Sequence, residues 1–125
     1  MLEVKSLSRD SKDFYRLMGP VFGSRGIARE VGIHIYDDAD KEWIVAFDDL
    51  IFAGFASIRG SLITDCYVRP EFRNAGVFTE ILKRVMLDPN ASRANCTAAS
   101  LPAFLNAGFK IVSETKNFTK VERYA

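Results

Sequence analysis

One segment with helical spacing interrupts a run of segments that read as β-strands, and this order restricts the possible folds. Residues 62–68 have strand character, residues 75–87 carry apolar side chains at helical spacing, and residues 93–97 read as a short strand again. A helix between two strands of one sheet acts as a crossover, which joins parallel neighbours. The sequence therefore predicts one parallel pair in a sheet that is otherwise antiparallel.

Strand-like and helix-like segments fill the rest of the chain, with no linker, repeat or low-complexity tract between them. A first helix is expected to follow Ser11 and to be broken by Gly19-Pro20, and the loop 22–26 leads into a short helix or irregular stretch. A short helix is expected at 101–106. The further expected strands are 2–7, 43–47, 50–58, 109–113 and 118–123. The predicted fold class is α/β, with a mixed, mostly antiparallel sheet and helices on both faces.

Length and cysteine content indicate how the chain is organised. The 125 residues are expected to form one domain, residues 1–125, whose core needs neither disulfide nor metal. Cys66 and Cys96 are too few for a disulfide framework, so a reducing, cytoplasmic location is expected. No stretch approaches the ~20 apolar residues of a membrane helix, and no signal-peptide pattern opens the sequence.

The charge of the chain is small and unevenly distributed. Residues 1–50 contain 7 basic and 10 acidic side chains, whereas residues 51–125 contain 10 and 6, so the net charges are −3 and +4. This mild asymmetry suits a small anionic ligand better than a nucleic acid, which would require a dense basic stripe. A solvated surface with uneven charge is the alternative interpretation.

The most suggestive chemistry lies where the strand 62–68 passes through a basic loop into the helix. Backbone N–H groups of a loop at a helix N-terminus form an anion site, and Gly76 lies in that loop. Arg69 and Arg73 flank it and can add charge-assisted hydrogen bonds to phosphate. The loop has neither the phosphate-binding pattern of nucleotide hydrolases nor the three-glycine pattern of dinucleotide-binding folds. A tight turn with surface arginines remains the alternative.

Two motifs in this half of the chain resemble those of the GNAT acetyltransferases. Residues 68–78, Val-Arg-Pro-Glu-Phe-Arg-Asn-Ala-Gly-Val-Phe, look like the acyl-CoA loop of that family, which has the pattern Arg/Gln-x-x-Gly-x-Gly/Ala after a strand ending in Val-x-Pro. Residues 101–109, Leu-Pro-Ala-Phe-Leu-Asn-Ala-Gly-Phe, look like its short helix ending in Gly-Phe. The order and spacing of the motifs also agree, so the resemblance spans nearly the whole chain.

The resemblance implies a GNAT-like sheet whose middle parallel pair splays apart to admit acetyl-CoA or another acyl-CoA as co-substrate. The pyrophosphate would meet the backbone amides of residues 73–78, and the pantetheine would lie along Tyr67 and Val68. The backbone N–H near Val68 would polarise the thioester carbonyl. The implied CoA-binding residues are Tyr67, Val68, Arg73, Asn74, Ala75, Gly76, Val77 and Phe78.

The sequence departs from the family pattern at three positions. Phe78 stands where many members have Gly or Ala, and Thr97 stands where an asparagine is frequent. Phe104 occupies the position of the tyrosine that often serves as general acid, and phenylalanine cannot give a proton to the CoA thiolate. The departures leave CoA binding better supported than catalysis.

Other side chains are therefore candidates for the proton transfers. Asp65, Tyr67 and Ser100 are the candidate catalytic residues, Asp65 as a base and the other two as acids. Glu114 is a further candidate base, and Tyr124 is a further candidate acid. Asp65 precedes Val68 by three residues, so the two side chains would point to opposite faces of a regular strand.

No metal site is expected, because the single histidine, His34, and two distant cysteines do not make one. We expect an N-acyltransferase that transfers the acyl group directly to an amine of a small molecule or a protein. A non-catalytic acyl-CoA sensor or partner protein of the same fold is the first alternative. A GNAT-like enzyme that modifies a nucleic-acid base is the second. The sequence leaves open whether the protein is a monomer or a homodimer.

Overall fold

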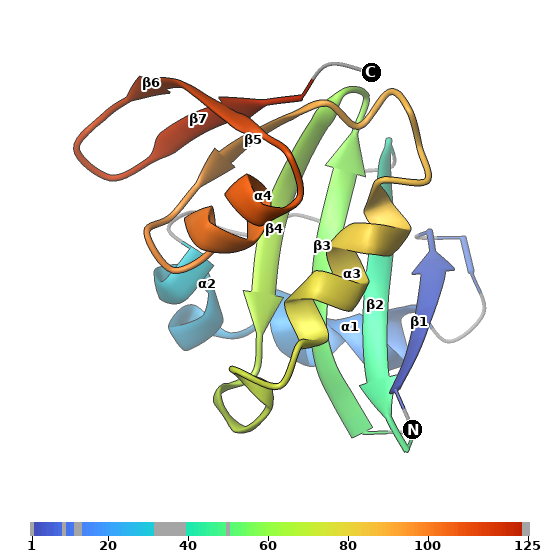
Figure 1. Ribbon diagram of the computed structural model, residues 1–125. Helices are drawn as coiled ribbons and strands as arrows, with labels where there is room; N and C mark the ends of the chain where they lie inside the picture. Colours follow the sequence, from blue (N-terminus) through green and yellow to red (C-terminus); the bar gives the residue numbers. More distant parts are fainter. Residues whose placement is uncertain (1, 9, 12–13, 32–39, 50, 124–125) are drawn as a thin grey trace.

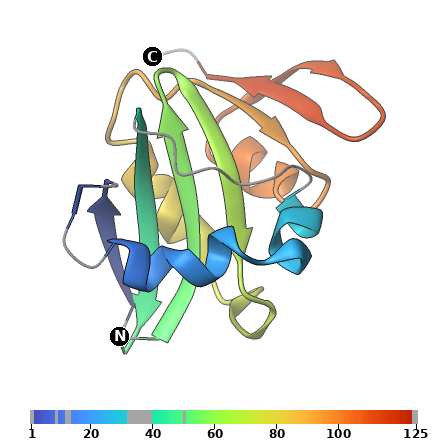
Figure 2. The same cartoon turned by 180° about the vertical axis from the view of Figure 1, so that it is seen from behind.

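The computed structural model describes residues 2–8, 10–11, 14–31, 40–49 and 51–123, which build one sheet with helices on both faces (Figures 1 and 2). The elements are β1 (Leu2–Leu7), α1 (Phe14–Phe22), α2 (Arg25–Val31), β2 (Lys41–Asp48), β3 (Ile51–Arg59), β4 (Leu62–Val68), the 3-10 turn η1 (Pro70–Phe72), α3 (Val77–Val85), β5 (Arg93–Cys96), α4 (Leu101–Asn106), β6 (Lys110–Glu114) and β7 (Thr119–Glu122). None of these helices combines the length and apolarity needed to cross a membrane.

The described strands form a seven-stranded sheet in the order β1-β2-β3-β4-β5-β7-β6. β4 and β5 are parallel, whereas the other neighbouring pairs are antiparallel, which confirms the predicted parallel pair in the middle of a mixed sheet. The parallel pairing joins Leu62 with Arg93 and Ile63 with Ala94 and goes no further. Beyond Ile63 the two strands diverge (Figure 1), so the predicted splay is present.

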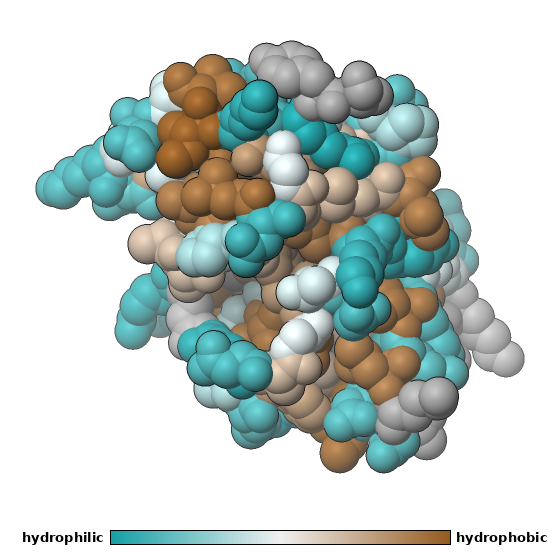
Figure 3. Space-filling model, in the orientation of Figure 1, coloured by the Kyte–Doolittle hydropathy of each residue, from teal (hydrophilic) through white to brown (hydrophobic). Residues whose placement is uncertain are grey.

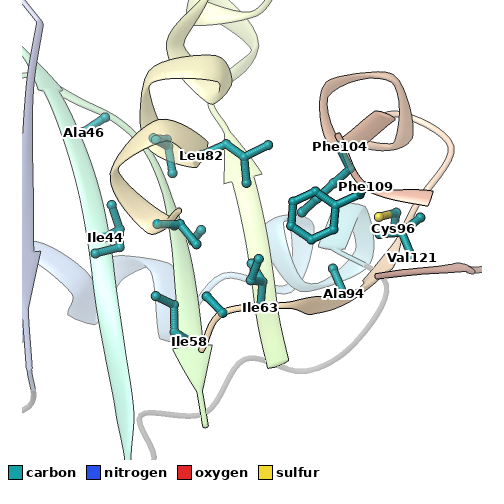
Figure 4. Packing of buried hydrophobic residues seen from close by; sticks show 14 of the residues in the cluster. Ile44, Ala46, Ile58, Ile63, Leu82, Ala94, Cys96, Phe104, Phe109 and Val121 are labelled. Atoms are coloured by element: carbon teal, nitrogen blue, oxygen red, sulfur yellow. The ribbon is translucent and has the colours of Figure 1, made fainter. Parts of the chain in front are cut away.

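The face of the sheet under α3 and α4 holds the larger core (Figure 4). α3 contributes Val77, Ile81, Leu82 and Val85, whose spacing places them on one side of a helix. They pack on inward side chains of the central strands, such as Ile63 of β4. The apolar side chains whose spacing predicted this helix therefore form the surface by which α3 packs over the splayed strands.

The opposite face carries an aromatic core covered by α1. Phe14, Met18 and Val21 are buried on one side of this helix, against a cluster that includes Trp43. The expected break at Gly19-Pro20 is wrong, because α1 continues through Pro20 to its end at residue 22. The free energy gained by burying these three side chains offsets the loss of the one backbone hydrogen bond that Pro20 cannot donate.

Two short turns connect the strands of the meander β2-β3-β4. Asp49 and Gly60 lie at these turns with positive φ angles of 48° and 62°. The register of β2 against β3 shifts next to Gly54. These short connections fix β4 beside β3 and bring its C-terminal end to the base of the loop before α3 (Figure 1).

Candidate functional site

The divergence of β4 from β5 opens a cavity of about 690 Å³. Its walls come from the end of β4, from the loop and first turn of α3, and from the segment 97–106 that contains α4. The volume lies within the range of small-molecule sites. The crossover topology therefore creates a site at the place where the two motifs of the sequence meet.

The loop before α3 has a backbone suited to anion binding. After η1 the chain passes through Asn74 and Gly76 with left-handed φ angles of 63° and 79°. Asparagine and glycine are the residues that tolerate this conformation best. A Cβ atom at Gly76 would meet nothing within 4 Å, so the φ angle rather than space explains the glycine. Left-handed residues of this kind turn successive N–H groups toward one side.

The first turn of α3 leaves its N–H groups available. Gly76 is the N-cap, and no side chain caps the helix. The N–H of Glu80 donates to the Gly76 carbonyl at 3.2 Å, and the preceding N–H groups of Val77, Phe78 and Thr79 have no carbonyl one turn earlier in the helix. These three residues line the cavity. The helix dipole adds positive potential there.

Of the two flanking arginines, Arg73 lines the cavity and Arg69 does not. Nε of Arg73 donates to the Val68 carbonyl at 3.0 Å, and its guanidinium lies 5.7 Å from the centre of the Tyr67 ring. Arg69 forms an ion pair with Glu71. Arg73 thus joins the loop to the end of β4 at the cavity edge, whereas the expected phosphate contact of Arg69 has no support in its position.

The wall formed by β4 contains a bulge. Phe55 pairs with Tyr67 and Ser57 with Thr64, so β4 has one more residue than β3 across this interval. The expectation that the Asp65 and Val68 side chains point to opposite faces assumed a regular strand, and the bulge removes that assumption because it breaks the alternation. The side chain of Asp65 lies outside the described residues.

The two sides of β4 face different cores at this bulge. Cys66 and Val68 pack with the core under α3 and α4, whereas Tyr67 packs with the aromatic core on the other face, 6.0 Å from the Phe55 ring centre. Gly54 of neighbouring β3 lets the two strands approach closely here, because a Cβ atom at this position would lie 2.5 Å from the Tyr67 carbonyl oxygen. The close approach of β3 therefore fixes the position of the wall.

Two hydroxyl groups, those of Thr97 and Ser100, lie on the wall opposite β4, and the thiol of Cys96 is buried in the adjacent core. Ser100 occupies the N-cap position of α4, but its side chain does not cap the helix. Its hydroxyl donates to the Thr97 carbonyl at 3.3 Å and lies 3.4 Å from Thr97 Oγ1. Burial raises the pKa of the Cys96 thiol from 9.0 to about 11, although a hydrogen bond with Ser100 opposes this. The thiol of Cys96 is therefore neutral at physiological pH.

Phe104 belongs to the core rather than to the cavity wall. It is 1% exposed, and its ring lies 5.1 Å from the neighbouring ring of Phe109 (Figure 4). The Phe78 ring lies 5.7 Å away, and both contacts have edge-to-face geometry. The position at which the resemblance implied a general acid is thus filled here by an apolar packing residue. Glu114 lies on exposed β6 and does not line the cavity.

Most of the predicted site residues meet at the cavity. Ala75 is exposed and does not line it, and His34 and Tyr124 lie outside the described residues. The predicted residues that do line it are Tyr67, Val68, Arg73, Asn74, Gly76, Val77, Phe78 and Ser100. Within the described ranges, no group of His, Cys, Asp and Glu side chains is arranged to hold a metal ion.

Sequence reasoning missed one wall of the cavity, which α4 forms. Pro102, Ala103 and Asn106 line it, and their spacing places them on one side of that helix. These residues are small or polar and lie opposite buried Phe104, and this contrast within one short helix is the signal that could have revealed them.

The sequence matches no protein-family model and no curated protein. The fold, in contrast, matches solved structures over their whole length. ElaA from Escherichia coli is 13% identical, with 99% of this chain and 100% of that chain covered and a TM-score of 0.73. An acyl-CoA N-acyltransferase from Pseudomonas aeruginosa is 12% identical, with 99% and 100% covered and a TM-score of 0.72.

A third similar structure was solved with a ligand. The PaiA N-acetyltransferase from Thermoplasma acidophilum, in complex with coenzyme A, is 12% identical, with 100% of this chain and 99% of that chain covered and a TM-score of 0.63. The chain therefore has the fold of the GNAT acetyltransferases, with their mixed sheet and splayed parallel pair.

Proposed function

We propose that the protein is an acyl-CoA-dependent N-acyltransferase that transfers the acyl group, most simply acetyl, directly to an amine of a small molecule or a protein. The observation that carries the proposal is the cavity in the splay, which brings the uncapped N-terminus of α3 and the open side of β4 together. The similar acyltransferase structures, one of them holding coenzyme A, support the same function.

The residues at the cavity fit the chemistry of acyl-CoA. A diphosphate needs several N–H donors in one concavity, and those residues of 74–78 that line the cavity can supply loop and helix amides there, with the Arg73 side chain at the edge. The pantetheine carries amide groups that need backbone partners. β4 beyond Ile63 has no β5 partner, so its backbone near Tyr67 and Val68 is open on that side.

Transfer joins the amine nitrogen to the acyl carbon as the carbon–sulfur bond breaks, and the amine proton passes to solvent or to a nearby base. The backbone N–H of Val68, next to the bulge, would polarise the carbonyl. Ser100 would donate a hydrogen bond to the departing thiolate, because its hydroxyl lies at the cavity and does not cap α4. Tyr67 and Asp65 remain the candidates for the proton transfers on the acceptor side. Positioning of an already activated thioester supplies much of the rate.

Isothermal titration with acetyl-CoA tests the binding half of the proposal, using two glycines that share a backbone conformation. Gly76 and Gly60 have φ angles of 79° and 62°, and a Cβ atom at either would meet nothing within 4 Å. Both Gly76→Glu and Gly60→Glu carry the same backbone strain. Only Gly76→Glu places a carboxylate at the proposed diphosphate site, and we expect it alone to abolish binding. Wild-type protein that is folded but does not bind acetyl-CoA would sink the proposal.

A second candidate is a non-catalytic acyl-CoA-binding sensor or partner protein. Burial of Phe104 favours it, because the core offers no acid at the usual position. Release of free CoA thiol across a broad panel of amines separates the two functions. Binding without release for every amine would favour the sensor.

We further propose that residues 1–125 work as one acyltransferase domain in the cytoplasm. The cores on the two faces share one sheet, which supports a single folding unit. The net charge of +1 supports a small-molecule or protein acceptor over a nucleic acid.

A further inference from the structure

The two cysteines of the chain lie on the two strands that diverge at the cavity. Cys66 is on β4 and Cys96 is on β5, and both are free thiols. Both side chains pack in the core under α3 and α4, so they lie on the same face of the sheet. Two thiols on one face of neighbouring strands can be joined by a disulfide if the strands come close enough.

The two cysteines also lie at the same level of the sheet. The last residues that pair between β4 and β5 are Ile63 and Ala94. On β5, Cys96 is two residues beyond Ala94. On β4, Cys66 is three residues beyond Ile63, but the bulge gives β4 one additional residue in this interval. Both thiols therefore lie two regular steps past the point where the strands separate.

Extension of the parallel pairing by two residues would bring these thiols together. Neighbouring strands lie about 4.8 Å apart, which is within the range of about 4.4–6.8 Å between the Cα atoms of a disulfide. In the structure the strands are apart at this level, and Cys66 lines the cavity between them. A disulfide would therefore hold β4 against β5 where the cavity now separates β4 from the segment 97–106.

The two thiols differ in their access to solvent. Cys66 is half-buried and lines the cavity, and the face that carries α3 and α4 is hollowed between α4 and the loop before α3 (Figure 3). A small disulfide molecule can therefore reach Cys66. Cys96 is 1% exposed, and burial raises the pKa of its thiol. Cys66 is thus suited to react first, and Cys96 is suited to react second, with a partner that the protein itself supplies.

We propose that a disulfide between Cys66 and Cys96 closes the splay between β4 and β5 and thereby prevents acyl-CoA binding under oxidising conditions. The Cys66 thiolate attacks one sulfur of a low-molecular-weight disulfide, such as glutathione disulfide, and displaces one thiol. The Cys96 thiolate then attacks the Cys66 sulfur and displaces the second thiol. The two cysteines are oxidised, the small disulfide is reduced, and the two cysteine protons pass to the two released thiols. Transient disulfides with a sensing role are the kind found in reducing compartments.

Closure of the splay would exclude the pantetheine of CoA, and this consequence rests on the proposed function. β4 is open near Tyr67 and Val68 only because β5 diverges after Ile63. A disulfide two steps past that point narrows the gap directly beside these residues. Bound acyl-CoA would in turn hold the strands apart and protect the thiols, because coupling between two binding or reaction events is reciprocal.

Alkylation after unfolding tests the closure without reference to CoA. The protein is incubated with glutathione disulfide, unfolded, treated with iodoacetamide and weighed by mass spectrometry. Oxidised wild-type protein should take up no alkyl group and keep no glutathione, whereas reduced protein should take up two alkyl groups, one at each cysteine. Cys96→Ser is the matched control, because it keeps Cys66 without the second thiol and should retain one glutathione. Wild-type protein that retains glutathione, or that stays fully alkylated, would overturn the proposal.

Titration of the same samples with acetyl-CoA tests the consequence for binding. Oxidised wild-type protein should lose measurable binding, and dithiothreitol should restore it. Cys66→Ser should bind acetyl-CoA equally before and after treatment with glutathione disulfide, because Cys96 alone is buried. A protein that carries the disulfide and still binds acetyl-CoA as tightly as its reduced form would also overturn the proposal. If the reduced protein does not bind acetyl-CoA, the proposed function fails, and the alkylation result still decides whether the splay closes.

Discussion

Substitution of Gly54 by alanine should destabilise the protein through one defined clash. The added Cβ atom would lie 2.5 Å from the Tyr67 carbonyl oxygen and 3.0 Å from Val68 Cα, both backbone atoms. Ordinary contact begins at 3.4 Å, so β3 and β4 must separate by roughly 0.9 Å there. Overpacking of this kind costs about 1–3 kcal/mol, and a rigid backbone neighbour places Gly54→Ala toward the upper end.

Urea unfolding monitored by tryptophan fluorescence measures this cost, because the single tryptophan, Trp43, lies in the core next to β3. With a slope of about 1–3 kcal/mol per M, a loss of about 2–3 kcal/mol lowers the midpoint by roughly 1 M or more. Gly26→Ala is the control: Gly26 lies in α2, where the nearest atom to an added Cβ is 3.8 Å away. That change should stabilise the protein by up to about 1 kcal/mol. The reasoning is refuted if Gly54→Ala unfolds at the wild-type midpoint.

The remaining predictions concern the site and its surroundings. Iodoacetamide at pH 8 should alkylate Cys66, which lines the cavity, much faster than Cys96, with CoA protecting Cys66; intact-mass spectrometry checks this. The raised pKa of Cys96 means that the unfolded protein ionises this thiol at lower pH than the folded protein does. The stability that the neutral thiol contributes should therefore be complete below pH 9 and decline as the pH rises toward 11, which unfolding midpoints at several pH values measure. Phe104→Ala should cost about 3–5 kcal/mol in urea unfolding, because it empties a fully buried ring site. Ser100→Ala should lower turnover while leaving the affinity for acetyl-CoA within twofold, and an equal loss of both would contradict its proposed role at the sulfur.

Strand and helix positions could be predicted wherever apolar spacing was regular. The strands 2–7 and 62–68 and the helix 101–106 have the predicted boundaries. The crossover helix is shorter than predicted, because Gly76 takes a left-handed conformation and α3 starts after it. Local periodicity is strong in these segments, since each buries one side against the sheet.

Long-range packing explains what the sequence did not reveal. Pro20 favours a helix end by its own chemistry, but burial of α1 against the aromatic core keeps the helix intact. The bulge before Tyr67 follows from the pairing of β4 with β3, which no local pattern of β4 encodes. The α4 wall of the cavity depends likewise on where the crossover places that helix. The motif residues were recognisable, whereas the surfaces that complete their site were not.

The central claim, that the splay between β4 and β5 holds acyl-CoA with its diphosphate at the start of α3, can be tested at individual amides. Titration of ¹⁵N-labelled protein with coenzyme A should shift the backbone amide signals of residues 73–79 and 66–68 most strongly. The amides of α1, on the opposite face, should change little. Saturating shifts confined to other residues, or no shifts from a folded protein, would contradict the proposed site.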